Sequence, residues 1–176
     1  MSKMITTWED EELNLKYNLL RGIYAYGFET PSPIQKSAVP TMVAKNKEGE
    51  RRDIIAQAQS GTGKTGAFTV STLQIIDESV KQTQALIIAP THELANQICH
   101  CVNELGRYLN IKVQLLVGGT SVEGDKDKLD NDTPHVAVGT PGRVHDMIRR
   151  KYLNVSTLKV LVLDEADEML STGFKE

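Results

Sequence analysis

A glycine-rich segment at residues 58–65, AQSGTGKT, has the residue types and the spacing of a loop that binds phosphate. It follows an apolar run and opens a stretch that is expected to be helical, which is the context that such a loop requires. Gly61 and Gly63 lack side chains, so backbone N–H groups can approach phosphate oxygens, and the helix start adds a partial positive charge. Lys64 can reach the β- and γ-phosphates of a nucleotide, and the Thr65 hydroxyl can bind Mg²⁺. The alternative is a plain strand-to-helix turn with an accidental lysine.

A second segment, LVLDEAD at residues 161–167, supplies two carboxylates. Its apolar part predicts a strand that delivers Asp164 and Glu165 to the carboxyl edge of a sheet. Beside a phosphate-binding loop, an aspartate in this position holds Mg²⁺. The adjacent glutamate is then placed to accept a proton from an attacking water. The two segments together indicate hydrolysis of a nucleoside triphosphate with Mg²⁺, whereas LVLDEAD alone could be a strand that ends in a solvated acidic turn.

Several apolar runs rich in Val, Ile and Leu must position these residues. They span 53–58, 84–90, 112–119, 135–140 and 158–166. Because they do not alternate with polar residues, they indicate strands buried on both faces of a parallel sheet. The stretches between them are long enough for one helix each, so the predicted fold class is α/β, a doubly wound sheet flanked by helices. Ligands of such sheets bind at the carboxyl ends of the strands.

The other stretches are expected to form a helix and polar surface. Residues 12–26 have the spacing of an amphipathic helix. Its apolar side chains are Tyr17, Leu20 and Tyr24 on one side, with Leu19 and Ile23 beside them. Residues 44–53 are predicted to form a polar loop of mixed charge, and residues 123–132 an acidic, solvated surface stretch.

The composition bounds the class of protein. The 176 residues are 40% hydrophobic and 24% charged with a net charge of −3, which fits one globular domain and argues against a strongly basic nucleic-acid coat. No apolar run is long enough to cross a bilayer and the first residues carry no signal-peptide pattern, so no membrane association is expected. Cys99 and Cys101 are too few for a disulfide framework or a zinc site, and we expect two reduced, packed thiols in an intracellular protein.

Six motifs in order carry a family resemblance: GFETPSPIQ, AQSGTGKT, PTHELA, the GG at 118–119, TPGR and the DEAD at 164–167. With them the chain resembles the first RecA-like lobe of a DEAD-box RNA helicase, from about Trp8 to its end. The stretch at 19–35 is especially similar to eukaryotic initiation factor 4A and its relatives. The resemblance implies that residues 1–176 form this ATP-binding lobe, a RecA-like P-loop NTPase domain, with an adenine-reading region at 8–36.

The resemblance also implies which residues bind ATP and Mg²⁺. Gln35 matches the glutamine that reads adenine, since an amide can accept from N6 and donate to N7, and Phe28 is placed against the base. The residues implied at the phosphates and Mg²⁺ are Ser60, Gly61, Thr62, Gly63, Lys64 and Thr65. SPIQ is also a capping-box pattern with Ser32 as N-cap and Pro33 at the first helical position, so capping alone is the alternative for Gln35. Trp8 is the candidate for the family's upstream aromatic, but its spacing is two residues too long, and packing is the alternative.

PTHELA, the glycine pair and TPGR resemble the family's contacts with the RNA backbone, and each follows a predicted strand at one edge of the sheet. The residues implied are Pro90, Thr91, His92, Gly118, Gly119, Thr140, Pro141, Gly142 and Arg143. Helix starts and glycine backbone can hold phosphates without reading sequence, and Arg143 can add a charged contact. Thr91 and Thr140 are also placed to cap helices, which is the alternative for the threonines. His92 stands where the family has arginine; histidine is mostly neutral at pH 7, so we expect weaker RNA binding.

Two parts of the family's machinery do not occur in these 176 residues: the Ser-Ala-Thr motif and the second RecA-like lobe, whose arginines stabilise phosphoryl transfer. In RecA-like sheets the Ser-Ala-Thr strand lies between the strand before the phosphate loop and the DEAD strand. We therefore expect a gap at that place, marginal stability of this chain alone, and a chain that is part of a longer protein.

The activity implied for the parent protein is ATP-dependent RNA strand separation, in the cytoplasm or the nucleus. Its implied partners are single-stranded RNA, the second lobe and a protein scaffold or activator, and translation initiation is the suggested process. Two alternatives remain, namely a module that binds nucleotide or RNA without turnover, and an enzyme that acts on DNA.

Overall fold

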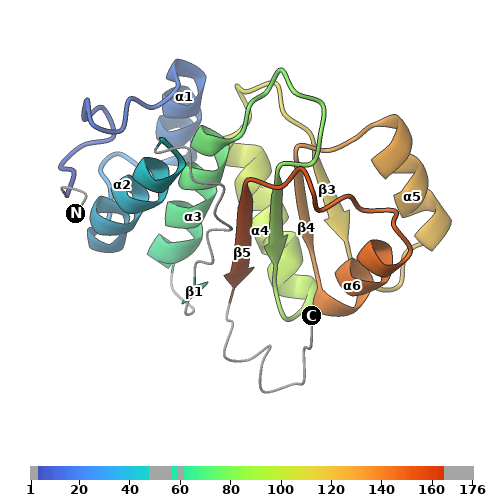
Figure 1. The fold of residues 1–176 in the computed structure, drawn as a ribbon. Helices are drawn as coiled ribbons and strands as arrows, with labels where there is room; N and C mark the ends of the chain where they lie inside the picture. Colours follow the sequence, from blue (N-terminus) through green and yellow to red (C-terminus); the bar gives the residue numbers. More distant parts are fainter. Residues whose placement is uncertain (1–3, 48–56, 59–61, 165–176) are drawn as a thin grey trace.

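The computed structural model describes residues 4–47, 57–58 and 62–164, which form a five-stranded parallel sheet between two layers of helices (Figure 1). Every strand pair is parallel, and the strand order is β1-β5-β2-β4-β3. In that order the strands are Gln57–Ala58, Val160–Asp164, Ala85–Ile88, Val136–Gly139 and Val113–Leu116. The predicted doubly wound α/β class is confirmed, and all the carboxyl ends of the strands lie at one edge of the sheet.

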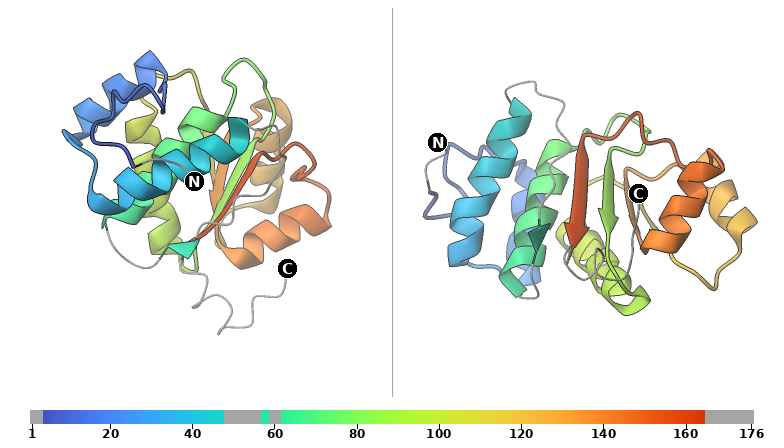
Figure 2. Two further views of the ribbon diagram at one scale, coloured as in Figure 1. Left: turned by 60° about the vertical axis from the view of Figure 1, so that its left-hand side comes forward. Right: turned by 60° about the horizontal axis from the view of Figure 1, so that its bottom comes forward.

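The helices divide between the two faces of the sheet (Figure 2). One face carries α1 (Tyr17–Tyr26), α2 (Pro33–Lys47), α3 (Thr62–Ile75) and α4 (His92–Leu105). The other carries α5 (Val122–Asn131) and α6 (Pro141–Arg149). Side chains of a strand point alternately to the two faces, so Ile87 belongs to the core under α1–α4 and its neighbour Leu86 to the smaller core under α5 and α6. Because both faces are covered, the central strands β2 and β4 are apolar at successive positions.

The prediction that the strands are buried on both faces is confirmed for β2 and β4, in which every residue is buried. It is wrong for β3 and β5, in which buried and half-buried residues alternate. In β3 the side chains of Val113 and Leu115 are half-buried, since β3 is the edge strand. In β5 the half-buried residues are Leu161 and Leu163, which pack on the smaller of the two cores. At β5 the smaller core therefore covers its face of the sheet less completely than the larger core does.

The prediction of a gap between the strand before the phosphate loop and the DEAD strand is wrong for the described residues. β1 pairs directly with β5, so that Gln57 lies opposite Leu163 and Ala58 opposite Asp164. The outer backbone groups at the carboxyl end of β5 thus have a neighbouring strand to pair with, which buried backbone requires. The same pairing brings the strand before the phosphate loop next to the strand that ends in DEAD.

The helix predicted over 12–26 begins later, at Tyr17, and buries a narrower face than expected. Of the side chains assigned to the apolar side of this amphipathic helix, Leu19 and Ile23 are buried, whereas Tyr17 and Tyr24 are 75% and 41% exposed. Gly22 explains the orientation, because a Cβ atom there would lie 2.0 Å from the Leu105 carbonyl oxygen. The glycine lets α1 approach α4 along the face that contains it, and the tyrosines are left outside.

Lys16 ties the segment before α1 to the end of α3. Its Nζ donates to the carbonyl oxygens of Leu73 at 2.9 Å and Ile76 at 2.5 Å, and its N–H donates to Gln74 Oε1 at 2.9 Å. A cation is favourable at a helix C-terminus. Burial lowers the pKa of Lys16 below its ordinary value, and the carboxylates of Glu78 and Asp77 oppose that shift. The helix that begins at the phosphate loop is thereby anchored at its far end.

Pro40 lies inside α2, where proline removes a backbone donor. The carbonyl of Lys36, four residues earlier, accepts instead from the Ile5 N–H at 3.1 Å. The N-terminal segment thus supplies the donor that Pro40 lacks for the Lys36 carbonyl. The prediction of a loop at 44–53 is wrong for residues 44–47, because α2 continues to Lys47. Residues 48–53 lie outside the described residues.

Candidate functional site

Gln35, the predicted adenine reader, links the start of α2 to the start of α3. Its Oε1 accepts from the Ser32 N–H at 2.9 Å, and the Ser32 hydroxyl accepts from the Gln35 N–H at 3.4 Å, so the predicted capping box is formed. The Gln35 Nε2 donates to the Gly63 carbonyl oxygen at 3.2 Å. Gln35 is 2% exposed. The amide therefore caps one helix and holds the phosphate-loop helix with the same side chain.

Two glycines let α3 pack against this segment. A Cβ atom at Gly66 would lie 2.6 Å from Gln35 Nε2 and 2.8 Å from the Phe28 ring. A Cβ atom at Gly63 would lie 2.7 Å from the Ile34 side chain. The half-buried Phe28 ring also contacts Tyr26 edge-on, with ring centroids 4.9 Å apart. Phe28 and Gln35 are thus brought together on the glycine face of α3.

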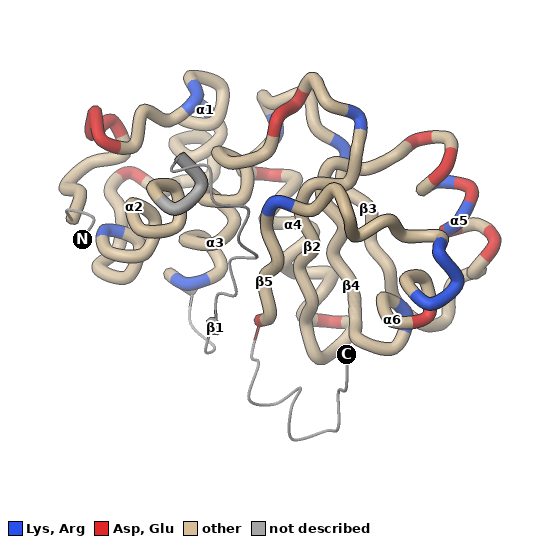
Figure 3. Tube along the Cα trace, viewed as in Figure 1, with Lys and Arg blue, Asp and Glu red and all other residues tan. Residues whose placement is uncertain are grey.

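Asp164 and the start of the phosphate loop meet at the carboxyl edge of the sheet. Ala58 and Asp164 are partners on neighbouring strands, which in a sheet lie about 4.8 Å apart. Asp164, the last residue of β5, is 6% exposed; Figure 3 shows an acidic residue, in red, where the described part of that strand ends. Lys64 and Thr65 lie half-buried in the first turn of α3. Ser60, Gly61 and Glu165 lie outside the described residues, and Thr62 is the first residue of α3.

Mg²⁺ suits the donors at this edge. The Thr65 hydroxyl and the Asp164 carboxylate offer hard oxygen atoms, which Mg²⁺ prefers. These residues would hold the ion, which would supply charge stabilisation at the phosphates.

The first of the predicted RNA-backbone elements is the start of α4. The Thr91 hydroxyl accepts from the Leu94 N–H at 3.2 Å, so the predicted cap is formed. His92 is the first residue of α4 and is exposed, as are Thr91 and Glu93, and Pro90 is half-buried. This helix start is open to solvent at the carboxyl edge of β2.

The other two elements follow β3 and β4. Gly118 and Gly119 are exposed, and Gly119 has φ 88°, a conformation that favours glycine. Pro141 is at the start of α6 as predicted, and Gly142 beside it is exposed. Thr140 occupies the N-cap position, but its hydroxyl makes no capping hydrogen bond, so that part of the capping prediction is wrong.

Arg143 does not extend into solvent. Its Nη1 donates to Asp125 Oδ2 at 2.6 Å, and its Nη2 donates to the Thr120 carbonyl oxygen at 2.9 Å. The side chains of Arg143 and Asp125 are only 9% and 8% exposed. The sequence missed Asp125 because residues 123–132 were expected to be solvated surface, whereas they lie almost entirely in α5 with Asp125 and Leu129 buried. The serine that caps α5, Ser121, was the available signal for a helix there.

Trp8 and the cysteines have packing roles in the described structure. Trp8 is fully buried in the larger core, in keeping with the packing alternative. Cys101 is buried and Cys99 half-buried, and both are free thiols. Burial raises the pKa of each thiol above its ordinary value, which makes them poor nucleophiles.

The comparisons with known proteins agree with this geometry. Residues 32–176 match the family model described as DEAD/DEAH box helicase, and the chain belongs to that family. It is 57% identical to an "ATP-dependent RNA helicase eIF4A" of Pyricularia oryzae over 94% of this chain and 40% of that protein. It is 54% identical to the "ATP-dependent RNA helicase fal1" of Schizosaccharomyces pombe, over 98% of this chain and 44% of that protein.

A solved structure gives the same relationship. The chain superposes on S. cerevisiae Dbp5 bound to RNA and ADP BeF3 with a TM-score of 0.77 and 41% identity, covering 91% of this chain and 39% of that one. The chain therefore has the RecA-like fold of these helicases and spans about 40% of the length of the relatives it matches. Among the described residues, no helix combines the length and the apolar character needed to cross a membrane.

Proposed function

We propose that this chain is the first RecA-like lobe, residues 1–176, of an ATP-dependent RNA helicase. It binds ATP with Mg²⁺ and holds one RNA strand by its backbone. The observation that carries the proposal is the strand pairing of Ala58 with Asp164, together with the Gln35 amide on Gly63. These contacts bring the adenine-reading segment, the phosphate-loop helix and the DEAD strand to one edge of the sheet.

The residues divide by ligand. Phe28 and Gln35 hold adenine, within an adenine-reading region at 8–36. The loop and first turn of α3, residues 60–65, hold the phosphates, with Lys64 on the β- and γ-phosphates. Thr65 and Asp164 hold Mg²⁺, and Glu165 orients and activates the water. The starts of α4 and α6 and the Gly118–Gly119 loop hold RNA phosphates, which predicts binding that is indifferent to sequence and sensitive to salt.

ATP binding by the 176-residue chain tests this assignment. We expect a fluorescent ATP analogue to bind in the presence of Mg²⁺, and Lys64→Ala to abolish most of that binding because the phosphates lose their cation. Asp164→Asn should retain nucleotide binding but weaken its dependence on Mg²⁺. Arg149→Ala, on the exposed end of α6, is the matched control and should bind as the unmodified chain does. Equal binding by Lys64→Ala and the control would refute the proposal.

Turnover is a separate question, because the chain spans about 40% of its relatives. Arginines from a second RecA-like lobe would stabilise the transferring phosphoryl group, an effect worth about 10³–10⁵ in rate for comparable arginines. We therefore propose binding with at most slow hydrolysis for these 176 residues and RNA-stimulated hydrolysis for the parent protein. An ATPase assay with and without RNA separates the two.

The alternative to the proposed RNA helicase is an enzyme that acts on DNA. Competition between RNA and DNA strands of one sequence tests the choice of RNA. Preferred binding of the DNA strand would overturn it. We further propose that the parent protein works in the cytoplasm or nucleus with a protein scaffold or activator, and translation initiation is the process suggested by the relatives named eIF4A.

A further inference from the structure

We infer that Arg143 is a positioning residue: it fixes the Gly118–Gly119 loop to the start of α6 and does not itself bind an RNA phosphate. The inference deepens the proposed function and rests on it, because the loop and the helix start are the proposed RNA-backbone contacts. It changes the role expected for the arginine of TPGR from a ligand of RNA to a latch between two elements that hold RNA.

The Arg143 guanidinium makes three hydrogen bonds inside the protein. Nη1 lies 2.6 Å from Asp125 Oδ2 and 3.0 Å from the Thr120 hydroxyl, and Nη2 lies 2.9 Å from the Thr120 carbonyl oxygen. With about nine-tenths of both charged side chains buried, the pair is shielded from solvent. One arginine thereby joins α6, α5 and the residue that follows the glycine pair.

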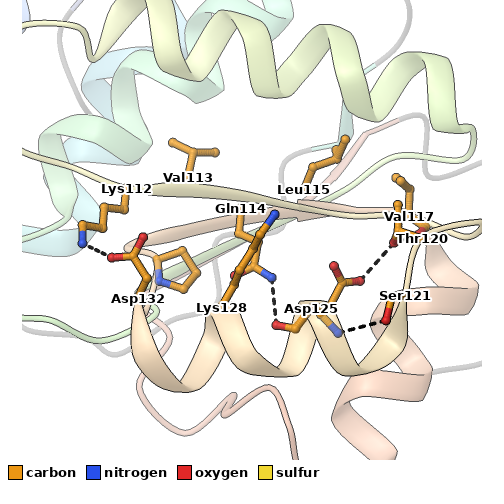
Figure 4. A pocket seen from close by; sticks show the side chains of 12 residues that line it. Lys112, Val113, Gln114, Leu115, Val117, Thr120, Ser121, Asp125, Lys128 and Asp132 are labelled. Atoms are coloured by element: carbon orange, nitrogen blue, oxygen red, sulfur yellow. Dashed lines mark hydrogen bonds and ion pairs between the residues drawn. The ribbon is translucent and has the colours of Figure 1, made fainter.

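Asp125 is itself held in place, so it is a firm anchor for the latch. It lies in the first turn of α5, where a carboxylate is favoured by the helix dipole. Figure 4 shows the rest of its surroundings: its carbonyl oxygen accepts from Gln114 Nε2 at 3.1 Å, and its Oδ2 lies 3.3 Å from the Thr120 hydroxyl. That hydroxyl also lies 3.0 Å from the Val117 carbonyl oxygen. Thr120 therefore connects Val117, at the start of the glycine loop, to Asp125 in the helix that follows it.

The glycine pair is open on the side where a side chain would stand. A Cβ atom at Gly118 or Gly119 would meet nothing within 4 Å. The position of these exposed backbone groups therefore depends on the neighbours at 117 and 120. Arg143 makes the loop and the start of α6 one body, so that the N–H groups of both keep a fixed spacing along an RNA backbone.

Energetics favour the latch over a direct phosphate contact. Withdrawing one partner from a buried ion pair leaves the other charge uncompensated, and this costs more than a charge-assisted hydrogen bond at an exposed site returns. To reach an RNA phosphate, Arg143 would have to leave Asp125 in that state. The exposed helix starts can bind phosphate without such a loss.

The isosteric variant Asp125→Asn separates the two roles by the sign of its effect. The measurement is the affinity of the 176-residue chain for a fluorescein-labelled single-stranded oligouridine over a series of salt concentrations. If Arg143 is a latch, affinity falls by about fivefold, the equivalent of one net hydrogen bond, and the salt slope is unchanged. If Arg143 is a phosphate ligand restrained by Asp125, affinity rises and the slope steepens by about 0.7. The second result overturns the inference.

Two further variants complete the test. Arg143→Lys keeps the charge but loses the planar fork, so a latch loses affinity whereas a simple phosphate contact tolerates lysine. Asp130→Asn removes the same charge from an exposed pair on the same helix and should leave affinity within the experimental error of the unmodified chain or raise it slightly. Weaker binding by this control than by Asp125→Asn would overturn the inference.

Amide exchange of residues 118–120 supplies a readout that needs no RNA. The latch predicts faster exchange of these amides in Asp125→Asn and no change in Asp130→Asn, whereas unchanged exchange in both overturns it. If the unmodified chain binds no oligouridine, the proposed RNA function fails, and the exchange rates still decide whether Arg143 holds the loop.

Discussion

Gln35 and Arg143 lie at opposite ends of the sheet's carboxyl edge, and each is a predicted ligand residue that makes internal hydrogen bonds. Gln35 makes neutral bonds to Ser32 and Gly63, while Arg143 makes a buried charge pair with Asp125. An amide oxygen has two lone pairs and an amide nitrogen two N–H groups. Gln35 therefore keeps one acceptor site and one donor N–H beyond these two bonds, and it can serve a ligand without leaving its place.

Arg143 differs in that it cannot leave its partner cheaply, because the counter-charge that it neutralises, Asp125, is buried with it. A neutral hydrogen bond contributes about 0.5–1.5 kcal/mol net, whereas breaking a buried ion pair costs about 3–5 kcal/mol. Internal engagement alone thus does not disqualify a ligand residue. The charge and the burial of the partner decide whether an internal hydrogen bond can be exchanged for one to a ligand. Gln35 can therefore act as a ligand residue, whereas Arg143 acts as a positioning residue.

The largest expected effect is on stability at the Arg143 end. Arg143→Met leaves Asp125 buried without its cation, so we expect the free energy of unfolding to fall by about 3–5 kcal/mol. Gln35→Met loses two neutral bonds and should cost about 2 kcal/mol. Urea denaturation of both variants measures the difference. A larger loss for Gln35→Met would reverse the comparison.

The surface provides a control for this measurement. Arg149 pairs with Asp146 on α6, and its side chain is 63% exposed. Arg149→Met makes the same chemical change as Arg143→Met, but exposed pairs contribute only about 0–1 kcal/mol. A loss at Arg149 as large as that at Arg143 would mean that charge rather than burial sets the cost.

A smaller and more local effect is expected at the Gln35 end from Gly66→Ala. The added methyl would lie 2.6 Å from Gln35 Nε2 and 2.8 Å from Phe28, so the Gln35 amide, the proposed adenine contact, must move. We expect ATP affinity to fall by about tenfold, which corresponds to about 1.4 kcal/mol, while oligouridine affinity without nucleotide stays unchanged. Titration with a fluorescent ATP analogue measures the change.

Gly124→Ala is the matched control for that substitution. A Cβ atom there has its first neighbour, Ser121 Cβ, at 3.5 Å, an ordinary contact, and the site lies on α5 away from the adenine segment. ATP affinity should be that of the unmodified chain. If Gly66→Ala also binds ATP normally, the packing of α3 on Gln35 has no part in nucleotide recognition.

The contacts that the sequence predicted are the local ones. The capping box joins Ser32 to Gln35 within one turn, and the Thr91 cap spans three residues, so a motif contains both partners. The parallel sheet was also predictable, because a strand that is buried on both faces is apolar at successive positions.

The contacts that the sequence did not predict join distant residues. Asp125 meets Arg143 18 residues further along the chain, and Gln35 meets Gly63 28 residues away. Nothing in the charge pattern of 123–132 distinguishes the buried Asp125 from its solvated neighbours. The direct pairing of β1 with β5 was missed for the same reason, because strand order is a property of the assembled sheet.

The substitution His92→Arg sharpens the comparison by placing an arginine at an exposed helix start, away from any buried carboxylate. His92 is exposed at the first position of α4, beside the Thr91 cap. An arginine here is free to contact an RNA phosphate, so affinity for oligouridine should rise by up to about tenfold and the salt slope should steepen by about 0.7. Asp125→Asn, by contrast, should weaken binding at constant slope. If His92→Arg changes neither affinity nor slope, the start of α4 is not an RNA contact. An exposed arginine would then have to be compared with Arg143 at the start of α6 instead.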